Sequence, residues 1–259
     1  MNDKQNQFYS SISKYYSEIF PYQPMQLQFV KNRVGDLNGK NILDIGCATG
    51  ELAFQLAGEG AKVIGIDLNE DLLSQANNHN DFRIADSKKR EPEFASPVFQ
   101  VGNMLELVTD FQEKQFDNIL CFGNTLVHLP SLMLMRQMFE GVFKVLKPGG
   151  YFLLQILNYD FILGEPVTEL PVIDSENIRF VRKYIIDEKS PLIRFQTQLE
   201  IKKEERTVNN ETLLFALKSA DLVELLKETG FKEIELFSNF KQEPFGGKHL
   251  PLVISALKE

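Results

Sequence analysis

Short apolar segments alternate with amphipathic helical segments along most of this chain, and that alternation limits the folds open to it. Apolar runs typical of buried strands are followed by stretches whose apolar side chains recur every three or four positions. We expect strands at 42–45, 62–66, 98–101, 118–122, 151–157, 233–237 and 252–257, and helices at 51–57, 71–77, 132–146 and 222–227. Strands that alternate with helices indicate a parallel sheet covered on both faces. The sequence therefore predicts an α/β fold built on a seven-stranded, mostly parallel sheet.

The pattern changes at both ends of this region. Residues 1–39 look helical and are rich in aromatic side chains, so we expect them to form an N-terminal helical cover. Charged and β-branched residues roughly alternate at 178–187 and 192–203, which is typical of antiparallel strands with one solvated face. We therefore expect a main domain at 40–259, with an inserted lid or interface at about 158–212.

Composition narrows the classes of partner. The chain has 259 residues, with 28 Lys and Arg against 36 Asp and Glu, which gives a formal net charge of -8. An acidic chain with scattered basic residues argues against nucleic acid as a partner. No apolar run approaches the roughly 20 residues that span a bilayer, and the first residues lack the apolar core of a signal peptide. We expect a cytoplasmic protein that binds no membrane.

A glycine-containing turn follows the first predicted strand, and this stretch has the sequence Asp44-Ile45-Gly46-Cys47-Ala48-Thr49-Gly50. Asp67 closes the next strand, where a carboxylate can accept two hydrogen bonds from a ribose diol. The turn has neither the three glycines that cradle the pyrophosphate of a dinucleotide nor the Lys-Ser or Lys-Thr of a phosphate-binding loop. Because Asp44 at its entrance would repel a phosphate, a cationic adenosine ligand suits this turn better.

Several blocks in chain order resemble the motifs of class I S-adenosylmethionine-dependent methyltransferases, which have a Rossmann-like fold. The blocks are 42–50, Asp67, Gly102-Asn103-Met104, 116–121 and Leu146-Lys147-Pro148-Gly149-Gly150. The resemblance implies that 40–259 is a methyltransferase domain and that S-adenosylmethionine is its cofactor. The cofactor-binding residues that it implies, together with an aromatic residue of the N-terminal cover, are Tyr16, Asp44, Gly46, Cys47, Ala48, Gly50, Asp67, Leu68, Asn103, Met104, Cys121 and Gly123.

A narrower resemblance points to the acceptor side of the site. The stretches 121–130 and 158–163 are similar to the corresponding parts of glycine N-methyltransferases, in which the Asn matching Asn158 contacts the substrate amino acid. We therefore expect Asn158, His128 and Asn124 in the catalytic site, although His128 could instead pack at a helix start and Asn124 could cap the next helix. Residues 1–35 and 164–215 show little likeness to that family, so the identity of the acceptor stays open.

These observations favour a methyltransferase that acts on a small molecule at nitrogen or oxygen, with no metal and with self-association possible. A protein that binds S-adenosylmethionine as a sensor or assembly module is the alternative from another class, and a nicotinamide-dependent oxidoreductase is a third. Methyl transfer needs orientation and a dry site more than a catalytic triad. Arg179, Arg182 and Arg194 in the insert could anchor a carboxylate, but charged alternating strands favour solvated positions for them.

Overall fold

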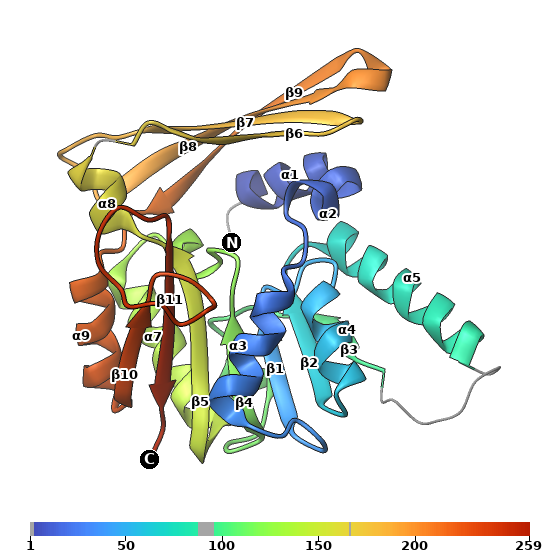
Figure 1. Ribbon diagram of the computed structural model, residues 1–259. Coiled ribbons are helices and arrows are strands. Elements are labelled where there is room, and N and C mark those ends of the chain that lie inside the picture. Colours follow the sequence, from blue (N-terminus) through green and yellow to red (C-terminus); the bar gives the residue numbers. More distant parts are fainter. Residues whose placement is uncertain (1–2, 88–95, 166) are drawn as a thin grey trace.

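The computed structural model describes residues 3–87, 96–165 and 167–259. Its main sheet has seven strands in the order β10-β11-β5-β4-β1-β2-β3 (Figure 1). The pairings of β11 with β10 and with β5 are antiparallel, and the other pairings are parallel. This arrangement confirms the predicted α/β, Rossmann-like architecture. The strands are β1 Asn41–Ile45, β2 Lys62–Asp67, β3 Val98–Val101, β4 Phe116–Cys121, β5 Leu146–Leu157, β10 Lys232–Phe237 and β11 Pro251–Leu257.

Helices cover both faces of this sheet. On one face α3 (Pro24–Val34), α4 (Glu51–Gly58) and α5 (Glu70–Ser87) pack over a cluster that includes Ile42 and Leu153. On the other face α7 (Leu132–Val145) and α9 (Ser219–Thr229) pack over a cluster that includes Leu43 and Leu154. Neighbouring residues of one strand thus enter opposite cores, as the pleat of a strand requires. The short helix α6 (Leu107–Asp110) packs against α7.

A second sheet lies across the main one, in the order β6-β7-β8-β9 (Figure 1). It consists of β6 Glu169–Asp174, β7 Ile178–Ile185, β8 Leu192–Ile201 and β9 Arg206–Phe215, and all of its pairings are antiparallel. The sequence pattern indicated only the two central strands of this sheet. The edge strand β9 carries polar side chains over most of its length and becomes apolar only at Leu213-Leu214-Phe215, so no clear alternation marks it.

The N-terminal segment lies between the two sheets (Figure 1). It forms α1 (Asp3–Ile12), a 3-10 turn (Ser13–Tyr15) and α2 (Tyr16–Ile19). Glu18 of α2 accepts hydrogen bonds from Ser175 and Asn177 in the β6–β7 turn. At the same end of the sheet, Lys14 pairs with Glu204 of the neighbouring β8–β9 turn at 2.8 Å. The cover and the second sheet are thus joined to each other over the carboxyl ends of the main strands.

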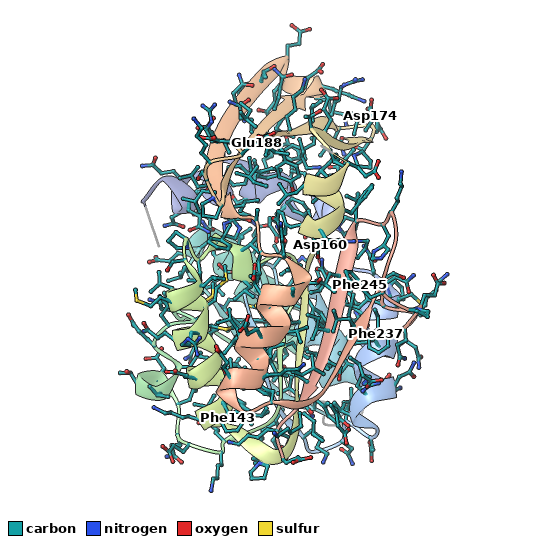
Figure 2. All side chains as sticks on the ribbon, turned by 90° about the vertical axis from the view of Figure 1, so that its left-hand side faces the viewer. Phe143, Asp160, Asp174, Glu188, Phe237 and Phe245 are labelled. Carbon is teal, nitrogen blue, oxygen red and sulfur yellow. The ribbon has the colours of Figure 1, made fainter. Side chains whose placement is uncertain are left out.

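The connection from the second sheet back to the main one is held by α8 (Tyr159–Gly164). Its Asp160 accepts a hydrogen bond from the backbone N–H of Ser219 at 2.9 Å (Figure 2). Asp160 therefore satisfies a backbone donor at the start of α9. Gly230 ends that helix with a φ of +112°, a conformation that favours glycine. Within the described residues, no helix combines the length and the apolar character needed to cross a bilayer.

Candidate cofactor and acceptor site

The turn after β1 approaches the loop after β4 very closely. Gly46 adopts a φ of +75°, and a Cβ built on it would lie 2.6 Å from the side chain of Thr125. The backbone N–H of Gly46 donates to the carbonyl of Ile66, and that of Ala48 donates to the Asp67 carboxylate at 3.0 Å. These bonds hold the turn against the end of β2. Only glycine satisfies both the backbone conformation and the space at position 46.

Asp67 is the carboxylate at the end of β2. Besides the bond from Ala48, it accepts one from the backbone N–H of Asn69 at 2.9 Å. Burial raises the pKa of Asp67, and the backbone N–H groups of Asn69, Ala48 and Leu68 offset part of that rise. Asp67 borders a small pocket of about 60 Å³ that is also lined by Leu68 and Met104.

Asp44 supplies a second buried carboxylate. Its side chain makes no hydrogen bond or ion pair with any residue in the described part of the chain, and only 4% of the residue is exposed. Burial and the charge of Asp67 raise the pKa of Asp44 to about 7. The buried carboxylate of Asp44 beside the half-buried one of Asp67, with no cation paired to either among the described residues, is costly unless a positively charged ligand compensates it. The carboxylates at this turn therefore favour a positively charged ligand.

A larger cavity of about 810 Å³ extends from this turn to the second sheet. It shares Tyr9, Tyr16, Gly46, Gly123 and His128 with the small pocket. On the side of the turn after β1 its lining includes Asp44, Cys47 and Ala48. On the side of the second sheet it includes Arg182 and Tyr184 of β7. Its volume is within the range of small-molecule sites, about 300–1,000 Å³.

His128 lies where the two cavities meet. Its Nε2 is 2.8 Å from the hydroxyl of Tyr9, and its Nδ1 is buried and has no hydrogen-bond partner among the described residues. Burial lowers the pKa of His128 to about 4, so the imidazole is uncharged at neutral pH. Burial also raises the pKa of Tyr9, which keeps its phenol protonated. The pair is thus a neutral hydrogen-bonding unit between the cover and the loop after β4.

The two asparagines have different environments. Asn124 has a φ of +66° and lines the larger cavity; its Oδ1 accepts from the backbone of Leu157 and its Nδ2 donates to the Tyr159 hydroxyl. Asn158 is 2% exposed, caps α8 through the N–H of Phe161, and donates to the carbonyl of His249. Asn158 therefore positions α8 and the C-terminal loop, and it does not belong to the lining of either cavity.

Most residues singled out from the sequence line these cavities. The cofactor candidates that do so are Tyr16, Asp44, Gly46, Cys47, Ala48, Asp67, Leu68, Met104 and Gly123. Three others are absent from both linings. Gly50 faces Phe99 and Ala76, the Asn103 side chain accepts from Leu105 within its own loop, and Cys121 is fully buried in the core beneath the site.

The lining also contains residues that the sequence analysis did not single out for the site, among them Tyr9, Gln155 and Tyr184, and it includes Arg182 as an inward side chain. The contact between Tyr9 and His128 joins positions 119 residues apart, so no local pattern marks it. Arg182 was detectable, since it follows Ile178 and Phe180 at a period of two on one face of a predicted strand.

Comparison with known proteins agrees with this geometry. A family model described as a methyltransferase domain matches residues 36–229. Glycine N-methyltransferase of Mus musculus is 29% identical over 128 residues, which cover 48% of this chain and 42% of that protein. A ubiquinone biosynthesis O-methyltransferase of Coxiella burnetii (strain Dugway 5J108-111) is 30% identical over 138 residues, or 53% of this chain and 52% of that protein. The aligned part thus spans about half the length of these relatives.

A solved structure agrees over nearly the whole chain. An S-adenosylmethionine-dependent methyltransferase from Clostridium acetobutylicum ATCC 824 superposes with a TM-score of 0.78, at 17% identity, over 97% of this chain and 99% of that one. This likeness shows the shared fold, the second sheet included in the matched span. The chain belongs to the methyltransferase-domain family, and its fold is that of the S-adenosylmethionine-dependent enzymes.

The residues of the turn fit S-adenosylmethionine. That molecule carries a sulfonium and an ammonium group, and the buried carboxylates of Asp44 and Asp67 lack a cationic partner in the described chain. Gly46 lines both cavities without a side chain, and a Cβ there would collide with Thr125. A diphosphate, by contrast, would bring negative charge next to the Asp44 carboxylate.

Proposed function

We propose that this protein transfers a methyl group from S-adenosylmethionine to a nitrogen or oxygen atom of a small molecule. The observation that carries the proposal is the 810 Å³ cavity, whose lining includes both the turn after β1 and the inner face of the second sheet. A cavity roofed by the cover and the second sheet suits an acceptor that fits inside it beside the cofactor.

Each residue of the site then has a definite task. Asp67 binds the ribose hydroxyls of the cofactor, and Asp44 stabilises its positive charge. Tyr16 of the cover closes the space over the two carboxylates and excludes water, because it belongs to the lining of both cavities. S-adenosylmethionine, when bound, supplies a methyl group that is already activated for displacement.

His128 is the candidate for proton movement on the acceptor side. When Nε2–H donates to Tyr9, the Nδ1 atom carries a lone pair, and no other described residue uses it. An uncharged imidazole can accept a proton from an acceptor amine or hydroxyl during transfer. Tyr9 positions the ring, and Asn124 positions the loop that carries it through its bonds to Leu157 and Tyr159.

The proposal is tested by measuring S-adenosylhomocysteine formation with a panel of small amines, phenols and hydroxy acids, alongside protein and nucleic-acid fractions. We expect product with a small acceptor and its loss in His128→Ala, while His79→Ala, a substitution on α5 away from the cavities, keeps activity. Tight cofactor binding without turnover on any fraction would favour the sensor alternative. Product formed only with the protein or nucleic-acid fractions would contradict a small-molecule acceptor.

A further inference from the structure

Arg182 occupies a position on the inner face of β7 that its neighbours make apolar. Ile178, Phe180 and Tyr184 alternate with outward residues and are buried, and Arg182 lies between the last two. Its register partner on β8 is Thr197, which is only 4% exposed. The expectation of a solvated side chain is therefore wrong for Arg182, whereas Arg179 and Arg194 are exposed as expected.

The guanidinium of Arg182 is only partly satisfied by the protein. One nitrogen donates to the carbonyl of Pro171 at 2.8 Å, and the Nε atom is buried without any partner among the described residues. No carboxylate of the described chain pairs with Arg182. In contrast, Arg33, Arg136, Arg179 and Arg206 each form an ion pair. Burial also lowers the pKa of Arg182, which reflects the uncompensated charge.

Further polar atoms close to Arg182 lack partners as well. The Tyr184 hydroxyl is buried beside that of Tyr159 but makes no hydrogen bond of normal geometry, and the Thr197 hydroxyl is buried without a partner. Buried polar groups are usually satisfied. Because Arg182 and Tyr184 both belong to the lining of the larger cavity, their unsatisfied donors indicate a ligand that completes them.

The charges of the cavity are separated along its length. Asp44 and Glu51 lie on the side of the turn after β1, whereas Arg182 belongs to the second sheet. The remaining charged residues of the lining are Lys241 and Glu243 of the C-terminal loop, both exposed, and Glu243 accepts from Asn239. The lining also includes four phenylalanines, Phe20, Phe122, Phe195 and Phe240. A ligand with one anionic end and an apolar body matches this arrangement.

The geometry points to an acceptor that carries a carboxylate, bound by the Arg182 guanidinium on the wall formed by the second sheet. The inference rests on the proposed function, because it assigns that end of the cavity to the methyl acceptor. A guanidinium binds a carboxylate through two parallel N–H bonds, and the Tyr184 hydroxyl is an additional donor. The nitrogen or oxygen to be methylated then extends toward the turn after β1.

Binding of matched acid and amide pairs tests this inference without turnover. We would titrate benzoate, 4-aminobenzoate and indole-3-acetate, each against its amide, into the full-length protein saturated with S-adenosylhomocysteine. For at least one pair we expect the acid to bind ~10-fold or more tightly than the amide, as a charge-assisted bond predicts. Arg182→Gln should bring the two affinities within about 2-fold, and Arg182→Lys should keep part of the preference.

Arg194→Gln is the matched control, because Arg194 on the neighbouring strand β8 is exposed and pairs with no carboxylate of the described residues. It should leave the preference for acids unchanged. Equal binding of acids and amides by the wild-type protein, or no binding of any pair, would overturn the inference. A preference that persists in Arg182→Gln would overturn it too. Titration of S-adenosylmethionine alone tests the proposed function separately, since loss of that binding leaves the comparison of acids with amides interpretable.

Discussion

The hydroxyl of Tyr9 lies 2.8 Å from Nε2 of His128, and this bond joins the N-terminal cover to the loop after β4. Both side chains border both cavities. Their rings also meet edge to face, with centroids 5.5 Å apart. The orientation of His128 therefore depends on a residue of the cover, so folding of the cover and completion of the site are coupled.

Removing the Tyr9 hydroxyl tests that coupling. Tyr9→Phe keeps the ring but leaves Nε2 of a buried histidine unsatisfied, which costs about 1–3 kcal/mol. We expect a lower free energy of unfolding in urea and a lower turnover number. Tyr15→Phe, which removes an exposed bond to Glu204 in the same segment, should change stability by less than about 0.5 kcal/mol. Equal effects of the two substitutions would contradict the role given to Tyr9.

The main sheet was predictable because its strands are local apolar runs. Ile42–Ile45 and Phe152–Ile156 are buried on nearly every residue, so their hydrophobicity alone marks them as central strands. β5 nevertheless begins at Leu146, earlier than predicted, because Pro148-Gly149-Gly150 belongs to the strand instead of preceding it. The edge strand β9 escaped prediction, since polar residues occupy both of its faces and pairing with β8 determines its conformation.

The two halves of the site also differ in how far the sequence could predict them. The cofactor half was predictable because Gly46 and Asp67 follow strand ends, and parallel strands bring such ends to one edge of the sheet. The acceptor half depends on contacts between distant segments, such as that of Tyr9 with His128. The direction of Arg182 follows from period-two alternation, but the composition of the insert favoured solvent for it.

Asp67→Ala should weaken the binding of S-adenosylmethionine. Loss of hydrogen bonds from the ribose hydroxyls to a charged group costs about 1.5–3 kcal/mol, or roughly 10- to 150-fold in the dissociation constant. Calorimetric titration measures the change. Asp67 also accepts from Ala48 and Asn69, so Asp67→Asn serves as a milder variant, and Asp71→Ala on the exposed surface of α5 should bind normally. An unchanged dissociation constant in Asp67→Ala would refute the ribose assignment.

Asp44 gives the ligand-free protein a stability that depends on pH. Because its pKa is raised from 3.8 to about 7, the folded state binds the proton more tightly, and stability falls as pH rises between these values. Asp44→Asn removes this dependence. The variant should therefore gain stability relative to the wild type, by about 2 kcal/mol or more, when the pH increases from 4 to 8.

The same substitution removes the compensating charge for the cofactor, so Asp44→Asn should bind S-adenosylmethionine more weakly at pH 8 despite its greater stability. Urea unfolding across pH and calorimetry at pH 8 measure the two effects. A difference in stability that does not vary with pH would show that Asp44 does not titrate in this range.

Gly46 and Gly35 both have a φ of +75°, a value that favours glycine, but their surroundings differ, so together they help to separate backbone strain from steric exclusion. A Cβ at Gly35 would meet nothing within 4 Å, whereas one at Gly46 would lie 2.6 Å from Thr125. Gly35 has a ψ of -133°, which side-chain-bearing residues rarely combine with a positive φ, so Gly35→Ala should cost about 1–3 kcal/mol of folding free energy. Gly46→Ala should cost more and also impair binding of S-adenosylmethionine, because the turn must move away from Thr125.

Shortening the opposing side chain provides the decisive comparison. Thr125→Gly combined with Gly46→Ala should recover part of the lost affinity, whereas the same Thr125 substitution combined with Gly35→Ala should recover nothing. Thermal unfolding and calorimetry on the four variants separate strain from contact. If Gly46→Ala bound the cofactor as tightly as Gly35→Ala does, the close approach between the two loops would not be what shapes this site.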